Sequence, residues 1–171
     1  MMKSEGRALC GARFLYPLVL ALLLLFWHAT RPFVAVHAEN GLLAFCPADA
    51  GTELSTRFIH SVQKTPVEEF FLVNDAQDGF ILQKTRYRSF GVGLPFLETD
   101  GIFRREGDAF VMDNMNRRMQ EIQLRPGVST DLTLYLAGEE IPLCERMPPG
   151  SLVRIAIVPR WRIWANKFRF S

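Results

Sequence analysis

The chain has 171 residues, of which 49% are hydrophobic and 12% aromatic, with 20 basic and 18 acidic side chains. This composition excludes disorder as the default and is enough for one domain with a sizeable core. Residues 39–159 carry 12 basic and 17 acidic side chains, a net charge of −5. A mildly acidic body argues against a nucleic-acid-binding groove, so we expect no nucleic-acid partner.

Residues 1–38 have the plan of a secretory signal peptide. Lys3, Arg7 and Arg13 precede an apolar run over 14–27, and the end at 36–38 offers a small-residue cleavage site. The run is shorter than the roughly 18–20 residues that usually span a bilayer. We expect export to the periplasm, with the segment either cleaved or kept as an inner-membrane anchor. The basic flank stays inside in both cases, so residues after about 38 lie outside the cytoplasm.

The stretch 39–159 is predicted to form one β domain. About ten short apolar or alternating runs are separated by turn residues, and we find no convincing amphipathic helix. The expected fold is all-β, a small antiparallel β-sandwich or partly open barrel preceded by an N-terminal apolar helix. The expected strands are 41–46, 54–63, 67–74, 80–87, 101–105, 108–112, 119–124, 131–136, 141–144 and 151–158.

The second and third of these strands predict a hairpin with a polar pair. If Val62 faces Val67 across the turn, His60 faces Glu69. An imidazole and a carboxylate among Phe and Val are costly to bury unless they satisfy each other. Two interpretations stay open: a structural bond within the β core, or a polar patch that binds a ligand.

A glycine-rich bend follows at 89–95. Two glycines around one valine suit a bulge or corner, and their amides could also hold an anion. With the hairpin, this bend completes the set of ligand-binding candidates. They are His60, Ser61, Thr65, Glu69, Ser89, Gly91 and Gly93.

Two cysteines lie in the exported part, Cys46 near its start and Cys144 close to its end. An even pair in an oxidising compartment predicts a disulfide, which would contribute about 4–5 kcal/mol in the chain-entropy model. The alternative is two buried free thiols. Because one cysteine pair and one well-placed histidine fall short of a ligand set, we expect no metal and no cofactor.

The tail 160–171 is separate in character. Its four cations alternate with two Trp and two Phe, and it has no acidic residue. Such a mixture suits a membrane surface, where aromatic rings lie at headgroup level and cations meet anionic lipid. It would equally suit a last strand with one face on the core.

Two motifs in this order carry a family resemblance. The first is His60-Ser61-Val62 with Thr65-Pro66-Val67 and Glu69, and the second is Ser89-Phe90-Gly91-x-Gly93-Leu94-Pro95. From about Leu42 to Val158 the chain resembles the uncharacterised bacterial family called domain of unknown function 1850. Val92 stands where an alanine is expected, and the basic aromatic tail is not part of the pattern.

The resemblance implies a role but no reaction. Members of that family are often encoded beside tripartite ATP-independent periplasmic transporters of the TAXI type. We therefore expect a non-enzymatic accessory or binding component linked to solute uptake, whose partner is a TAXI-type transporter subunit or a small solute.

Two alternatives remain open. One is a serine-type hydrolase that uses Ser61 or Ser89 with His60 and Glu69, although neighbouring strand residues point to opposite faces. The other is a purely structural domain in which the polar cluster stabilises the interior.

Overall fold

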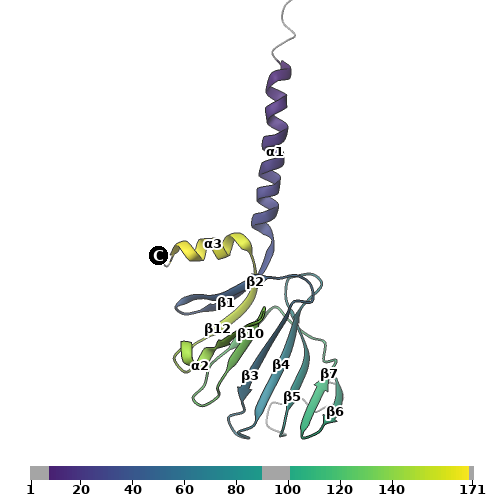
Figure 1. Cartoon of the computed structure of the whole chain (residues 1–171), viewed down its shortest axis with the longest axis vertical. Coiled ribbons are helices and arrows are strands. Elements are labelled where there is room, and N and C mark those ends of the chain that lie inside the picture. The colour runs from purple at the N-terminus through teal and green to yellow at the C-terminus, as the bar shows by residue number, and fades with distance from the viewer. Residues whose placement is uncertain (1–7, 90–100, 170–171) are drawn as a thin grey trace, which may run out of the picture.

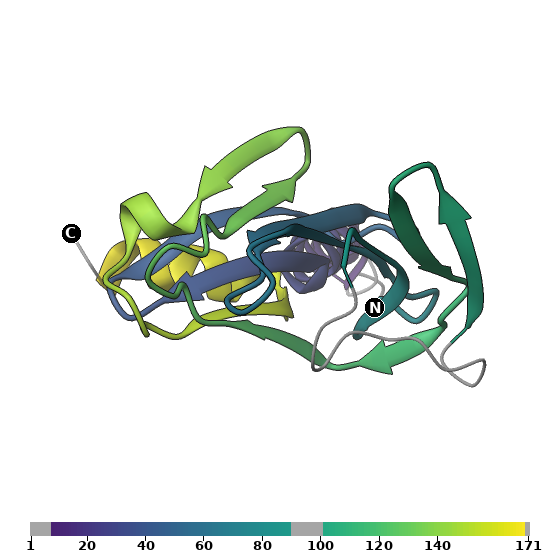
Figure 2. The same ribbon diagram turned by 90° about the horizontal axis from the view of Figure 1, so that it is seen from below.

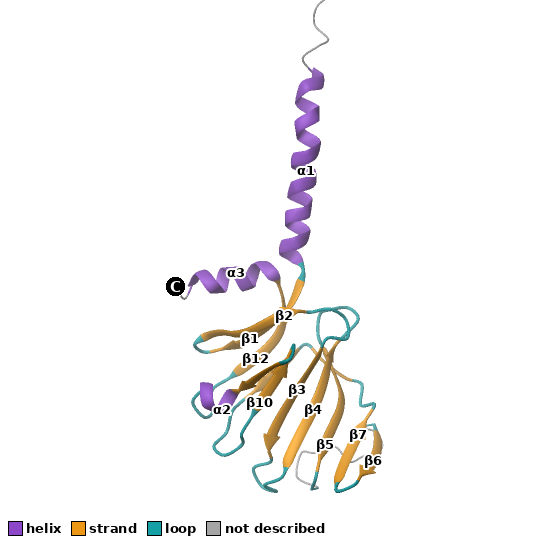
Figure 3. Cartoon of the chain, viewed as in Figure 1, coloured by secondary structure: helices purple, strands orange, loops and turns teal. Residues whose placement is uncertain are grey.

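A computed structural model describes residues 8–89 and 101–169 of the chain. One long helix projects from a body made of strands, and a second helix lies crosswise at its base (Figure 1). Figure 3 shows that almost all of the body is strand and connecting turn. The helices are α1 (Ala8–Thr30), α2 (Leu143–Arg146) and α3 (Arg160–Arg169).

The strands form two antiparallel sheets. Sheet A has four strands in the order β2-β1-β12-β9, and sheet B has eight, in the order β11-β10-β3-β4-β5-β7-β6 with β8 paired to β5. The strands are β1 (Pro32–Ala38), β2 (Gly41–Pro47), β3 (Glu53–Ile59), β4 (Pro66–Val73), β5 (Phe80–Tyr87), β6 (Ile102–Glu106), β7 (Ala109–Asp113), β8 (Arg117–Met119), β9 (Glu121–Leu124), β10 (Thr133–Leu136), β11 (Glu139–Pro142) and β12 (Val153–Pro159).

One hydrophobic core is shared by the two sheets. Val36 and Ile155 enter it from sheet A, and Leu134 and Phe80 enter it from sheet B, each with no exposed surface. The described strands do not close into a barrel, because the ordered pairings leave each sheet with two ends. The expectation of an antiparallel β body with an N-terminal helix is therefore confirmed.

The structure corrects the predicted boundary after residue 38. Residues 32–38 form β1, which lies between β2 and β12, and Val34, Ala35 and Val36 are fully buried. A strand that is buried on both faces has a continuous apolar sequence and not an alternating one. The sequence of β1 therefore looks like a continuation of the apolar segment before it. The β body begins at Pro32.

The start of β1 and the end of β12 lie at the same end of sheet A. β1 pairs with β12 from Pro32 opposite Pro159 onward, so Arg31 and Arg160 meet where the strands end. The backbone N–H of Arg160 donates to the carbonyl of Arg31 at 2.9 Å. Helices α1 and α3 therefore leave the body from neighbouring points, α1 projecting outward and α3 lying crosswise, while the β6–β7 hairpin lies at the far end of the body (Figure 1 and Figure 2).

Two further expectations were wrong. Residues 160–169 form a helix, not a last strand, and residues 143–146 leave the strand pattern for the single turn α2. In each case the preceding strand ends at a proline, Pro159 or Pro142. Proline has no N–H for the ladder and its fixed φ suits the start of a helix.

Candidate functional site

The β3–β4 connection is longer than predicted. β3 ends at Ile59 and β4 begins at Pro66, and Phe58 rather than Val62 faces Val67. The N–H of His60 donates to the carbonyl of Thr65 at 2.9 Å, and Lys64 takes a φ of 54° inside the turn. The predicted register is wrong because residues 60–65 form the turn and cannot extend the ladder.

His60 therefore closes the turn and does not pair with Glu69. Its Nδ1 accepts hydrogen bonds from the backbone N–H groups of Val62 and Gln63, both at 3.2 Å. Glu69 lies four residues after Thr65 along the extended chain, which places it about 13 Å from the turn. The histidine and the carboxylate lie on one hairpin but at different levels of it.

The remaining polar candidates are distributed around this turn. The Ser89 hydroxyl donates to the Gln63 side-chain oxygen at 3.1 Å, which brings the end of β5 against the turn. Ser61 is exposed, and the buried Thr65 hydroxyl has no partner in the described part of the chain. Gly91 and Gly93 lie outside the described residues. Sequence reasoning missed Gln63, whose only signal was its place in the turn.

Glu69 lies on the side of sheet B that faces the core. It stands opposite Thr56 on β3 and Thr85 on β5, and both threonines are almost fully buried. The Thr56 hydroxyl donates to Oε2 of Glu69 at 3.2 Å. Burial raises the pKa of the Glu69 carboxyl, and the hydrogen bond from Thr56 and the charge of Arg117 oppose that rise. The arrangement can hold a proton or a hydrogen bond inside the sheet.

Cys46 and Cys144 are free thiols, so the predicted disulfide is wrong. Cys46 is buried in β2, where burial and the neighbouring Asp49 raise the pKa of the thiol. The sulfur of Cys144 lies on α2 and accepts a hydrogen bond from the N–H of Leu132 at 3.1 Å. Each sulfur is part of a separate local environment.

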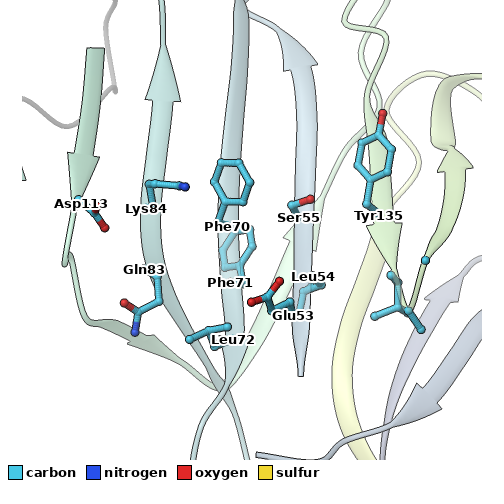
Figure 4. Close-up of a pocket in the computed structure, with 13 residues that line it drawn as sticks. Glu53, Leu54, Ser55, Phe70, Phe71, Leu72, Gln83, Lys84, Asp113 and Tyr135 are labelled. Atoms are coloured by element: carbon cyan, nitrogen blue, oxygen red, sulfur yellow. The ribbon is translucent and has the colours of Figure 1, made fainter. Parts of the chain in front are cut away.

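The solvent-facing side of sheet B carries a groove of about 560 Å³ (Figure 4). Strand register aligns one row of side chains across four strands, Tyr135, Ser55, Phe70 and Lys84. The ammonium of Lys84 lies 4.2 Å from the centre of the Phe70 ring. An aromatic pair with hydrogen-bonding groups is the composition that protein-binding surfaces favour.

A bulge in β5 shapes this groove. Phe70 pairs with Lys84 but Phe71 pairs with Leu82, so Gln83 is one extra residue on β5. Bulges bend the strand and re-aim its side chains. Glu53 and Asp113 add negative charge to the groove. Sequence reasoning missed this surface, although Phe70 at an outward strand position was a signal.

No group of three or more His, Cys, Asp or Glu side chains in residues 8–89 and 101–169 is placed to hold a metal ion. Among those same residues, no helix has both the length and the sustained hydropathy that crossing a bilayer needs.

Comparison with known proteins identifies the family. Residues 54–143 match the family described as Domain of unknown function (DUF1850), and the chain belongs to that family. The matched segment runs from β3 to the start of α2 and is shorter than the resemblance expected from the motifs. No curated protein and no solved structure matches the chain.

Proposed function

We propose that the protein is an exported, non-enzymatic accessory of the cell envelope that binds a partner protein through the outer groove of sheet B. The observation that carries this proposal is the row of Tyr135, Ser55, Phe70 and Lys84 across four paired strands. All four residues lie within the family-matched segment. Rigid strands hold the row in one geometry, so binding loses little conformational entropy.

The chemistry of the groove favours a protein over a small solute. Pockets for small molecules are enclosed and mostly apolar, whereas this groove is open and combines two aromatic rings with charges of both signs. Tyr and Phe at the centre of a polar rim are typical of protein interfaces. The family resemblance suggests a subunit of a TAXI-type transporter as the partner, which links the protein to solute uptake.

The position of β1 supports a tether rather than a cleaved leader. Only Arg31 separates α1 from β1, and cleavage after Ala38 would remove the strand between β2 and β12. Described side chains on all sides of α1 expose apolar surface to solvent, from Leu15 to Trp27. A helix that is apolar all round needs an apolar environment, and the inner membrane would supply one to the inserted side chains without α1 having to cross it completely.

The geometry of the hairpin weighs against the hydrolase alternative. A serine nucleophile needs a base within hydrogen-bond reach, and that base needs an orienting acid. Here Nδ1 of His60 accepts from the turn, the Ser89 hydroxyl donates to Gln63, and Glu69 is bonded to Thr56. The other alternative, a purely structural domain, explains the buried position of Glu69 but not the outer groove.

Site-specific photo-crosslinking tests the proposal. A photoreactive phenylalanine analogue replaces Phe70 in one variant and Val128 in another, and intact cells are irradiated. Val128 is 79% exposed in the loop between β9 and β10 and does not line the groove, so it is the matched control. We expect a transporter subunit as an adduct at position 70 only.

Two results of this experiment would contradict the proposal. Equal adducts at positions 70 and 128 would mean that the groove is not a preferred contact. No protein adduct at position 70, together with unchanged solute uptake when Phe70 and Tyr135 are both replaced by Ala, would reject the partner-binding role.

A further inference from the structure

All three tryptophans of the chain lie where α1 meets α3. Trp27 belongs to the last turns of α1, and Trp161 and Trp164 belong to α3. Their exposed fractions are 59%, 47% and 37%. Large exposed aromatic residues gathered at one level of a molecule mark an interaction surface.

Arg160 fixes α3 at this level. Its guanidinium lies 2.7 Å from Nε2 of His28 on α1 and 5.3 Å from the ring centres of both Phe33 and Trp164. The ring of His28 is in turn 6.1 Å from that of Trp164. The first turn of α3 is thereby held against the base of α1 and the end of β1.

Ile163 fixes the inner side of α3. It is 2% exposed and packs with Phe33 and Ala35 of β1, on the face of sheet A that points away from the main core. Trp161, Arg162 and Ala165 are exposed on the other side of the helix. The packing gives α3 a defined inner face and a defined outer face.

Cations accompany the exposed rings. The guanidinium of Arg31 lies 4.7 Å from the Trp27 ring centre, and that of Arg162 lies 5.4 Å from the Trp161 ring centre. A cavity of about 620 Å³ beside the base of α1 is lined by Trp27, Arg31 and Arg160, and also by Asp49. We define the aromatic collar as Trp27, Arg31, Arg160, Trp161, Arg162 and Trp164.

We propose that the aromatic collar lies in the headgroup layer of an anionic phospholipid bilayer. The exposed apolar side chains of α1 then lie in the hydrocarbon on one side of the collar, and the two sheets lie in water on the other (Figure 1). Trp rings favour this depth because one edge is apolar and the indole N–H needs a polar partner. Guanidinium groups meet the phosphates of anionic lipids there.

The chain favours a lipid surface over a protein for this end of the molecule. Three contacts between a cation and an aromatic ring lie within the collar, and α3 has no acidic residue to disfavour anionic lipid. An apolar helix continues directly from it. This inference does not depend on the partner-binding role of sheet B, because the groove and the collar share no residue.

Depth-dependent fluorescence quenching tests the inference. The full chain with Trp27→Phe and Trp164→Phe keeps Trp161 as its one fluorescent tryptophan, and circular dichroism checks that it folds as the unmodified chain does. It is reconstituted into vesicles of phosphatidylcholine, alone or with phosphatidylglycerol. The lipid chains carry bromine either near the headgroup or near the chain end.

We expect shallow bromines to quench Trp161 several-fold more than deep bromines, with emission shifted to shorter wavelength. The quenching should be stronger with phosphatidylglycerol and should weaken as salt is added. Arg162→Glu should lower it at least twofold. Arg105→Glu makes the same charge change on β6, at the far end of the molecule, and should leave it unchanged.

Three results would overturn the inference. Trp161 could stay unquenched with water-like emission, which would place α3 away from lipid. Deep bromines could quench it as well as shallow ones, which would place it within the hydrocarbon. Quenching that changes neither with phosphatidylglycerol nor with Arg162→Glu would show that the cations do not contact headgroups.

Discussion

Sheets A and B share one core but present opposite kinds of outer surface. The outer side of sheet A is covered by α3, which buries Phe33 and Ala35 under Ile163. The outer side of sheet B has no such cover in the described chain and carries Phe70 and Tyr135 in an open groove. One sheet therefore has a covered outer side, and the other displays its outer side chains.

The two sheets also differ in how they relate to the family. The matched segment, 54–143, supplies every strand of sheet B but only β9 of sheet A. The core cluster nevertheless includes Val34, Val36 and Ile155, which lie outside that segment. The folded unit is therefore larger than the family-matched segment, because sheet B needs sheet A to cover its inner face.

Removing β1 should have the largest effect on this shared core. A chain that lacks residues 1–38 loses the strand between β2 and β12, whereas a chain that lacks residues 1–30 keeps it. We expect the shorter chain to lose cooperative thermal unfolding, since the cost exceeds about 5 kcal/mol, the stability of many domains. Circular dichroism melts compare the two. Equal melting would show that β1 is dispensable.

A pair of core truncations should report whether the two sheets unfold together. Leu134 in β10 and Ile155 in β12 are both fully buried in the same cluster. Leu134→Ala and Ile155→Ala should each cost about 2–5 kcal/mol, and each should leave one unfolding transition. Chemical denaturation followed by two probes measures this. Separate transitions for the two variants would mean that the sheets are independent.

Glu69→Gln should raise stability at neutral pH. Because burial raises the pKa of the Glu69 carboxyl, the folded state binds more protons than the unfolded state between the two pKa values. The free energy of unfolding therefore falls as pH rises through that window, and the cost of the buried carboxylate is greatest above it. Gln keeps an acceptor for Thr56 without the charge, so we expect Tm to rise by about 2–4 °C at pH 7.

The same variant should gain nothing in acid, below the ordinary pKa of a glutamate, where both states are protonated. Glu68→Gln is the matched control, since Glu68 lies on the outer side of the same strand, 3.4 Å from Arg86, in a partly exposed ion pair. Thermal melts of both variants across pH test the comparison. A pH-independent effect of Glu69→Gln would contradict the buried carboxyl.

The smallest effect is expected from a reductant. Both cysteines of the body are free, so dithiothreitol should leave Tm unchanged. A disulfide between Cys46 and Cys144 would have contributed about 4–5 kcal/mol, and its reduction would lower Tm clearly. Thermal melts of the protein with and without reductant distinguish these outcomes.

Much of sheet B could be predicted from the sequence. Strands such as β4 and β10 alternate between core and solvent, and this pattern marks their extent to within one or two residues. Strand β1 could not be recognised in the same way, because both of its faces are buried and it follows an apolar helix.

The candidate site was less predictable. The register of the β3–β4 hairpin depends on Lys64 adopting a positive φ, which the residue type does not reveal. The outer groove depends on the extra residue Gln83 in β5 and on the curvature of four strands. The alternation of apolar and polar residues indicates which face of the sheet a side chain is on. It does not indicate whether that face carries a groove.

The N-terminus of the mature protein shows whether α1 is retained or cleaved. We expect α1 and β1 to stay joined, so that one end of a single core is attached to the membrane. Mass spectrometry should find residues 32–38 in the folded protein, contiguous with residues of α1. A mature chain that begins at residue 39 and still unfolds cooperatively would contradict the account.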